Sequence, residues 1–140
     1  MARREVAVPD SSVAVKWFSR EDGSEGALEL MEAHAGGRIE LAVLELLFCE
    51  VANALRHNPG FDAERLGDAI EQLFRLHMRV VPVDGGLMRR AGEIAFDAKV
   101  TVYDALPVAL AEAEEAMCIT ADEATQYAWL KPKGYPIELL

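Results

Sequence analysis

Cysteine and histidine are scarce in this chain, which has two Cys and three His among 140 residues. Cys49 and Cys118 each lie in an apolar segment and form no Cys-x-x-Cys pair, so we expect two reduced, buried thiols. The histidines lie far apart and show no zinc-binding spacing, so we expect them on helix surfaces or at helix ends. These absences argue against a disulfide framework and against zinc chemistry.

Long hydrophobic runs are also missing. No apolar stretch approaches the roughly 18 residues that a membrane-spanning helix needs, and the first one, which ends at Asp10, is too short for a signal-peptide core. We therefore expect a cytoplasmic protein that makes no contact with a membrane. Its 140 residues, 51% hydrophobic and 27% charged, are typical of one globular domain, which we expect to span residues 1–140.

Positive charge is in short supply, because 14 Lys and Arg stand against 24 Asp and Glu and give a net charge of −10. Proteins that hold nucleic acid by broad neutralisation of phosphates normally have a basic surface, so this balance argues against that mode of binding. The argument weakens if several carboxylates share one bound metal ion, because the cation cancels part of their charge.

Short β-like runs alternate with amphipathic helical runs along the chain. Strands are predicted at residues 6–9, 39–43, 79–83, 116–120 and 136–140, and helices at 11–18, 25–35, 44–56, 62–76, 87–98, 103–115 and 123–130. This alternation predicts an α/β fold, a three-layer α/β/α sandwich whose parallel sheet is covered on both faces. Two consecutive helices at 45–76 predict an added helical hairpin beside the sheet.

Two local details concern the ends of these helices. Ser11 or Ser12 is available as the N-cap of the helix at 11–18. Pro107 would interrupt the interior of a helix, but it is tolerated in a first turn, where its missing N–H has no partner. We therefore expect Pro107 in the first turn of the helix at 103–115.

Four of the 24 acidic residues stand out by their surroundings. Asp10 follows the first predicted strand and Asp122 the fourth, and open parallel sheets bind ligands beyond the carboxyl ends of their strands. Glu50 and Asp104 lie in largely apolar helical segments, where an unpaired carboxylate is costly. Taken alone, each Asp is explained equally well as a cap or turn residue, and Glu50 as a solvated residue on a helix. Together they predict a divalent cation as their common partner, since few cations lie in similar settings.

Four segments carry a resemblance. They are Asp10-Ser-Ser-Val-Ala-Val-Lys-Trp-Phe, Glu50-Val-Ala-Asn-Ala-Leu, Tyr103-Asp-Ala-Leu-Pro-Val-Ala-Leu-Ala-Glu and Ile119-Thr-Ala-Asp-Glu, in this order. Together they resemble the motifs of PIN-domain proteins, closest to the VapC toxins of bacterial and archaeal toxin–antitoxin pairs. The resemblance covers nearly the whole chain and implies one PIN domain, with a five-stranded parallel sheet of order 3-2-1-4-5. It also implies an endoribonuclease that depends on Mg²⁺ or Mn²⁺.

The resemblance also assigns roles to residues. The catalytic and metal-binding carboxylates are Asp10, Glu50, Asp104 and Asp122, of which we expect Asp10 and Asp122 to lie closest to the metal. Supporting polar residues are Ser11, Ser12, Asn53 and Thr120. Candidate RNA contacts, each explained at least as well as an ordinary surface charge, are Lys16, Arg20, Arg56 and Lys99. The chain departs from the family pattern at Pro9, Leu44 and Pro107, and of these Pro107 bears on the geometry of the Asp104 helix.

The implied partners are an RNA substrate, a small VapB-like antitoxin and a second copy of the chain in a homodimer. An alternative is a catalytically silent PIN-fold module that binds RNA or protein, although retention of all four acids argues against it. Receiver-like and dehalogenase-like α/β folds fit less well. The first needs a late lysine that is missing, and the second needs an Asp-x-Asp pattern where the chain has Asp10-Ser-Ser.

Overall fold

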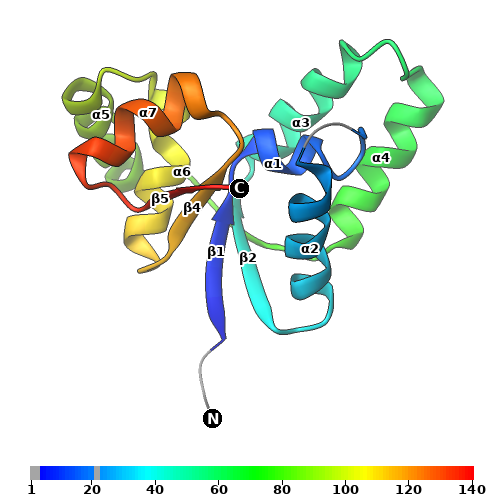
Figure 1. Cartoon of the computed structure of the whole chain (residues 1–140), viewed down its shortest axis with the longest axis horizontal. Coiled ribbons are helices and arrows are strands. Elements are labelled where there is room, and N and C mark those ends of the chain that lie inside the picture. Colours follow the sequence, from blue (N-terminus) through cyan, green and yellow to red (C-terminus); the bar gives the residue numbers. More distant parts are fainter. Residues whose placement is uncertain (1–3, 21–22) are drawn as a thin grey trace.

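A parallel sheet forms the centre of the computed structural model, which describes residues 4–20 and 23–140 (Figure 1). Its five strands are β1 (Glu5–Pro9), β2 (Ile39–Leu44), β3 (Arg79–Val81), β4 (Met117–Thr120) and β5 (Ile137–Leu139). They lie in the order β3-β2-β1-β4-β5, which confirms the predicted order. Strands β1 and β4 are therefore neighbours, with Val8 opposite Cys118 and Pro9 opposite Ile119.

The helices connect the strands as crossovers. They are α1 (Ser11–Val15), α2 (Ser24–Ala35), α3 (Leu46–Arg56), α4 (Ala63–Arg75), α5 (Gly85–Ala98), α6 (Val102–Ala113) and α7 (Ala128–Leu130). A π-helical turn at Glu123–Tyr127 precedes α7 and a 3₁₀ turn at Lys131–Lys133 follows it. The prediction of one plain helix over 123–130 is therefore wrong in its first half. Helices α3 and α4 form the predicted hairpin between β2 and β3.

Side-chain alternation along β2 shows how the sheet holds two layers of helices. Leu41 and Val43 are buried in a core with α1–α4, whereas Ala42 and Leu44 are buried in a second core with α5, α6 and α7. Successive residues of a strand point to opposite faces, so one strand supplies both cores. The two helical layers form the two lobes seen on either side of the strands in Figure 1.

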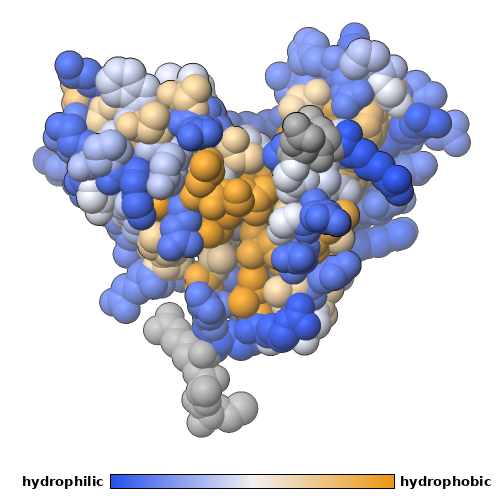
Figure 2. Space-filling model, viewed as in Figure 1, coloured by the Kyte–Doolittle hydropathy of each residue, from blue (hydrophilic) through white to orange (hydrophobic). Residues whose placement is uncertain are grey.

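On the face of the sheet that packs against α2, the helices cover β4 and β5 less completely than the other strands. Met117 and Ile119 of β4 are half-buried there, and Leu140 is 38% exposed. Figure 2 shows hydrophobic side chains in the hollow between the two lobes, surrounded by hydrophilic surface. None of the helices in the described residues is long and apolar enough to span a bilayer.

The scarce cysteine and histidine residues have different settings. Cys118 is buried as expected, but Cys49 is exposed, so the prediction of two buried thiols is wrong for Cys49. His34 lies in the last turn of α2, and its Nδ1 accepts a hydrogen bond from the Leu41 N–H at 3.1 Å. Its Nε2 lies 2.8 Å from the Leu76 carbonyl oxygen. The imidazole therefore joins α2, β2 and the end of α4.

Candidate functional site

Asp10 lies where β1 ends and α1 begins. Its backbone N–H donates to the carbonyl of Ile119 on β4 at 3.0 Å, which continues the pairing of the two strands. Its Oδ1 accepts the Ser12 N–H at 3.0 Å and the Val13 N–H at 3.4 Å, and it also contacts the Ser12 hydroxyl. Asp10 itself is therefore the N-cap of α1, and the prediction of Ser11 or Ser12 as the cap is wrong. Ser12 instead holds the carboxylate in place.

Thr120, the last residue of β4, lies directly beside this carboxylate and is fully buried. Its hydroxyl accepts the Asp122 N–H at 3.0 Å. The same hydroxyl oxygen lies 2.8 Å from Asp10 Oδ2 and 2.7 Å from Gln126 Oε1, yet it has one proton to donate. The Thr120 hydroxyl can therefore donate to only one of these two oxygens at a time. Burial raises the pKa of Asp10, whereas the hydrogen bonds from Ser12, Thr120 and Val13 lower it.

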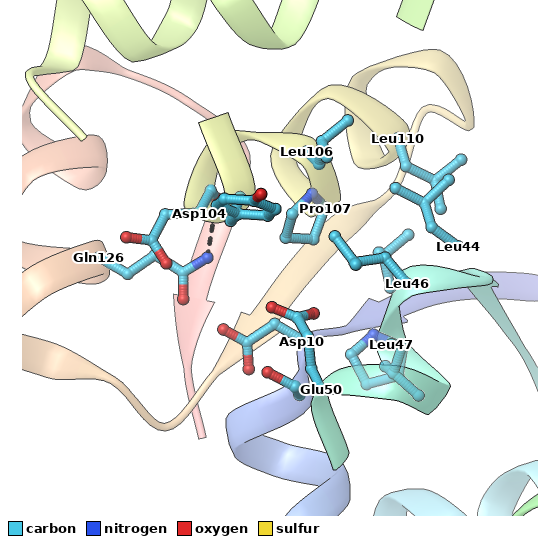
Figure 3. A pocket seen from close by; sticks show the side chains of 14 residues that line it. Asp10, Leu44, Leu46, Leu47, Glu50, Asp104, Leu106, Pro107, Leu110 and Gln126 are labelled. Carbon is cyan, nitrogen blue, oxygen red and sulfur yellow. Dashed lines mark hydrogen bonds between the residues drawn. The ribbon is translucent and has the colours of Figure 1, made fainter. Parts of the chain in front are cut away.

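One pocket brings together three of the four predicted carboxylates. Asp10 at the end of β1, Glu50 from α3 and Asp104 from α6 line it, with Gln126 beside Asp104 (Figure 3). The other side of the pocket is apolar and consists of leucine side chains, which are Leu44, Leu46, Leu47, Leu106 and Leu110. The cavity volume is about 30 Å³, enough for one or two water molecules. Carboxylate oxygens therefore face a small space that is apolar on its other side.

Asp122 lines a second pocket, and Ser11 belongs to both pockets. Ser12 and Lys16 also line this second pocket. The Asp122 carboxylate caps the π-helical turn, since its Oδ1 accepts the Thr125 N–H at 3.0 Å and its Oδ2 contacts the Thr125 hydroxyl. The four carboxylates are thus divided, three to one, between adjoining pockets.

These carboxylates act on one another electrostatically. Burial raises the pKa of Glu50 to about 7, with further increases from the negative charges of Asp10 and Asp104. Burial also raises the pKa of Asp104, and the negative charge of Asp122 raises it further. A hydrogen bond with Thr101 lowers the same pKa and offsets part of this increase. In the part of the chain that the structure describes, no Lys or Arg forms an ion pair with any of the four. Among these residues, the carboxylates of the site therefore lack a directly paired Lys or Arg.

The donor groups fit a hydrated divalent cation. Carboxylate and hydroxyl oxygens are the ligands that Mg²⁺ and Mn²⁺ prefer. Within residues 4–20 and 23–140, no three His, Cys, Asp or Glu side chains form a group that could hold a metal ion directly. Magnesium keeps several of its waters and is usually bound by only one or two carboxylates. The spacing therefore suits an ion that the protein holds partly through water.

The α6 helix begins earlier than predicted. Val102 is its first residue, and the Thr101 hydroxyl caps it by accepting the Asp104 N–H at 3.0 Å. Pro107 therefore lies inside the helix, so its prediction as a first-turn residue is wrong. Because proline has no N–H, the carbonyl of Tyr103, four residues earlier, loses its partner in the helix.

Several predicted residues lie away from the carboxylates. Asn53 is exposed and lines neither pocket, although it lies one turn beyond Glu50 on α3. Three of the basic candidates are likewise exposed and line neither pocket, namely Arg20, Arg56 and Lys99. Of the basic residues predicted to contact RNA, Lys16 alone lines one of the two pockets.

Sequence reasoning missed Gln126 and Tyr103, both of which line the first pocket. Tyr103 precedes Asp104 and is 64% exposed. Gln126 is 1% exposed, yet its segment is mostly polar and gave no sign of burial. Its place in a π-helical turn, which the 3.6-residue periodicity of an α-helix does not anticipate, explains why it was missed.

A comparison with known families identifies the family of this fold. Residues 7–128 match the PIN domain. The chain belongs to the PIN-domain family. A comparison with curated proteins found no match.

Several solved structures, VapBC and VapC proteins among them, resemble the chain over most of its length. DNA-bound VapBC from Salmonella typhimurium matches with a TM-score of 0.71 and 13% identity, covering 98% of each chain. VapC20 from Mycobacterium tuberculosis, described as a sarcin-ricin loop cleaving toxin, matches with a TM-score of 0.68 and 15% identity over 92% of this chain and 95% of that one. FitAcB from Neisseria gonorrhoeae matches with a TM-score of 0.66 and 14% identity over 87% and 91%. At these identities the likeness shows a shared fold.

Proposed function

We propose that this PIN domain is an endoribonuclease that hydrolyses RNA phosphodiester bonds with Mg²⁺ or Mn²⁺, and that it is the toxin of a VapBC-like toxin–antitoxin pair. The observation that carries the proposal is the convergence of Asp10, Glu50 and Asp104 in one pocket, with Asp122 in the adjoining one. Among residues 4–20 and 23–140, no Lys or Arg forms an ion pair with these carboxylates. Membership of the PIN family supports it, since these proteins are typically nucleases.

We propose that the carboxylates of both pockets bind the metal ion. Asp10, Glu50 and Asp104 would hold the ion from the first pocket, and Asp122 would contribute from the second. This differs from the expectation that Asp10 and Asp122 lie closest to it. The ion would neutralise phosphate charge and lower the pKa of a bound water.

Proton transfer would fall to Glu50. Without a bound ion, burial raises the pKa of Glu50 to about 7. A bound cation would lower this pKa and favour the carboxylate form, which can accept the proton of an attacking water. The hydrogen bonds of Ser12, Val13 and Thr120 keep Asp10 in place during this step. The leucine wall keeps bulk water from one side of the pocket.

Binding of RNA would use few phosphate contacts. Lys16 lines the second pocket beside Ser11 and Ser12, so it is the basic residue that we propose for a contact with a phosphate near the scissile bond. A net charge of −10 predicts modest overall affinity. Recognition of a folded RNA by its shape fits this charge better than broad neutralisation of the backbone.

Two protein partners belong to the proposal. The first is a small VapB-like antitoxin, which the toxin–antitoxin complexes among the structural relatives support. An acidic chain favours a partner with basic side chains. The second is another copy of this chain in a homodimer. The α3–α4 hairpin offers an apolar contact surface for a partner, because the Phe74 ring is 57% exposed and stacks on Phe48 at 4.3 Å between centroids.

Cleavage of a structured RNA by the purified protein tests the proposal. We expect cleavage with Mn²⁺ or Mg²⁺, none in EDTA, and recovery when Mn²⁺ is added back. Tight binding of Mn²⁺ without cleavage of any structured RNA would favour the silent binding module. Expression in a bacterial host tests the toxin assignment, because growth should slow and should recover when the antitoxin is co-expressed.

A further inference from the structure

We infer that Gln126 is a positioning residue that holds Asp104 and Asp10 at their spacing across the first pocket, through one hydrogen bond to each side of the site. The Gln126 Nε2 donates to the Asp104 backbone carbonyl at 3.0 Å, as the dashed line in Figure 3 shows. Its Oε1 lies 2.7 Å from the hydroxyl of Thr120, which is in turn 2.8 Å from Asp10 Oδ2. The inference rests on the proposed metal site.

Burial makes these contacts specific. Gln126 is 1% exposed and Thr120 is fully buried, so bulk water does not compete for these contacts. In the described residues, no buried side-chain nitrogen or oxygen lacks a hydrogen-bond partner. Loss of the amide would remove one partner of the Thr120 hydroxyl and would remove the link to α6. A buried polar group that keeps all its partners holds them in one arrangement.

Pro107 explains why α6 needs this support. Its missing N–H leaves the Tyr103 carbonyl without its helical partner, and helices tend to bend where a bond is lost in this way. Gln126 donates to the carbonyl of the next residue, Asp104, in the turn that Pro107 weakens. The amide therefore ties the weakened turn to β4 and keeps the Asp104 carboxylate in the pocket.

The same side chain thus acts on two elements that supply carboxylates. One end reaches α6, which carries Asp104, and the other reaches Thr120, whose hydroxyl faces Asp10. Loss of an outer partner of metal ligands typically weakens metal binding by about 10- to 100-fold. We expect Gln126 to act within this range, although it touches neither the ion nor the substrate.

Binding of Mn²⁺, measured by titration calorimetry, tests the inference without reference to activity. Gln126→Met keeps the length and volume of the side chain and removes both hydrogen bonds. It should weaken Mn²⁺ binding by about tenfold or more. The matched control is Gln72→Met, which changes an exposed glutamine on α4 and should leave the affinity unchanged. Melting temperatures measured alongside ensure that folded proteins are compared.

The outcomes separate the inference from the proposed function. An unchanged Mn²⁺ affinity in a folded Gln126→Met variant overturns the positioning role and leaves the metal site standing. Absence of Mn²⁺ binding by the wild-type chain overturns the metal site and the positioning role together. Weaker binding in Gln126→Met, with Gln72→Met unchanged, supports both.

A second variant tests the link to Pro107 and protects against a failure to fold. Pro107→Ala restores the N–H that pairs with the Tyr103 carbonyl, so α6 should depend less on Gln126. In the Pro107→Ala background, Gln126→Met should fold and should lower the Mn²⁺ affinity by less than it does in the wild-type background. An equal loss in both backgrounds contradicts the link to Pro107. A loss in neither contradicts the positioning role.

Discussion

Acidic side chains gather at both ends of the sheet, but only those at the amino end form ion pairs with an arginine in the described residues. At the amino end, Arg79 of β3 pairs with Glu40 of β2 at 2.6 Å and, through two nitrogens, with Glu114 after α6 at 2.7 and 3.0 Å. At the carboxyl end, Asp10 and Glu50 face one another in a pocket, and in the described residues no Lys or Arg is paired with either.

The two groups of carboxylates differ in whether a cationic side chain is paired with them. Hydrogen bonds to Glu114 and Glu40 hold the pKa of Arg79 well above its usual range, so both glutamates have a permanent counter-ion. At the other end, burial and mutual repulsion raise the pKa of Glu50, which is an energetic cost to the folded chain. Among the described residues, the acids are paired at one end of the sheet and unpaired at the other, and raised carboxylate pKa values of this kind are typical of functional sites.

The largest expected effect comes from Asp10→Asn. The Asn Oδ1 can keep the cap of α1, and its amide can donate to Thr120, so the fold should persist with an unchanged or higher melting temperature. RNA cleavage should fall by more than about 100-fold, since loss of even an outer partner of a metal ligand costs up to that much. Asp68→Asn, at an exposed position of α4, is the control and should keep full activity. A folded, fully active Asp10→Asn protein would refute the site assignment.

The next effect concerns the amino end. Arg79→Met leaves Glu40 and Glu114 without their shared cation, and the unfolding free energy should fall by about 1–2 kcal/mol, because the pair is only partly buried. Arg75→Met removes an exposed pair with Glu71 on α4 and should cost less than about 0.5 kcal/mol. Urea unfolding measures both. Equal losses of unfolding free energy in the two variants would show that the ion pairs of Arg79 stabilise the fold no more than an exposed pair does.

The smallest effect is the pH dependence of the metal-free protein. The folded pKa of Glu50, about 7, lies above its ordinary value of 4.5, so its stabilising contribution is full below pH 4.5 and is lost as the pH rises through 7. In EDTA, the melting temperature should therefore be higher near pH 5.5 than near pH 8. Glu50→Gln should reduce this difference by several degrees, whereas Glu45→Gln, at an exposed position, should retain it. A pH dependence unchanged by Glu50→Gln would contradict the raised pKa.

The acidic residues at the carboxyl end of the sheet could largely be predicted from the sequence, because the end of a strand is recognisable from neighbouring residues alone. Asp10 and Asp122 follow runs of β-forming residues, and parallel strands present such residues at one edge of the sheet. The adjacency of β1 and β4 came from the resemblance to PIN domains, since hydrophobic patterns do not specify which parallel strands are neighbours. The division of the carboxylates between two pockets depends on side-chain directions, which the order of elements does not determine.

Three residues of the structure, Cys49, Pro107 and Gln126, were predicted wrongly or not at all, and the physical reason differs for each. Helical spacing places Leu47, Val51 and Leu55 on one face of α3 and Cys49 on another, so the exposure of Cys49 was open to prediction but was obscured by its apolar neighbours. Thr101 caps α6, and noticing it would have placed Pro107 inside the helix. Gln126 is different, because its burial depends on a π-helical turn that no pattern in the sequence announces.

Calorimetric titration with Mn²⁺ at neutral pH tests the central claim most directly, because it asks whether the carboxylates at the carboxyl end of the sheet bind a cation. The wild-type chain and Arg79→Met should bind Mn²⁺ with the same affinity, since Arg79 lies at the opposite end, and Asp10→Asn should show no measurable binding. Absence of binding by the wild-type chain, or equal binding by Asp10→Asn, would contradict the account.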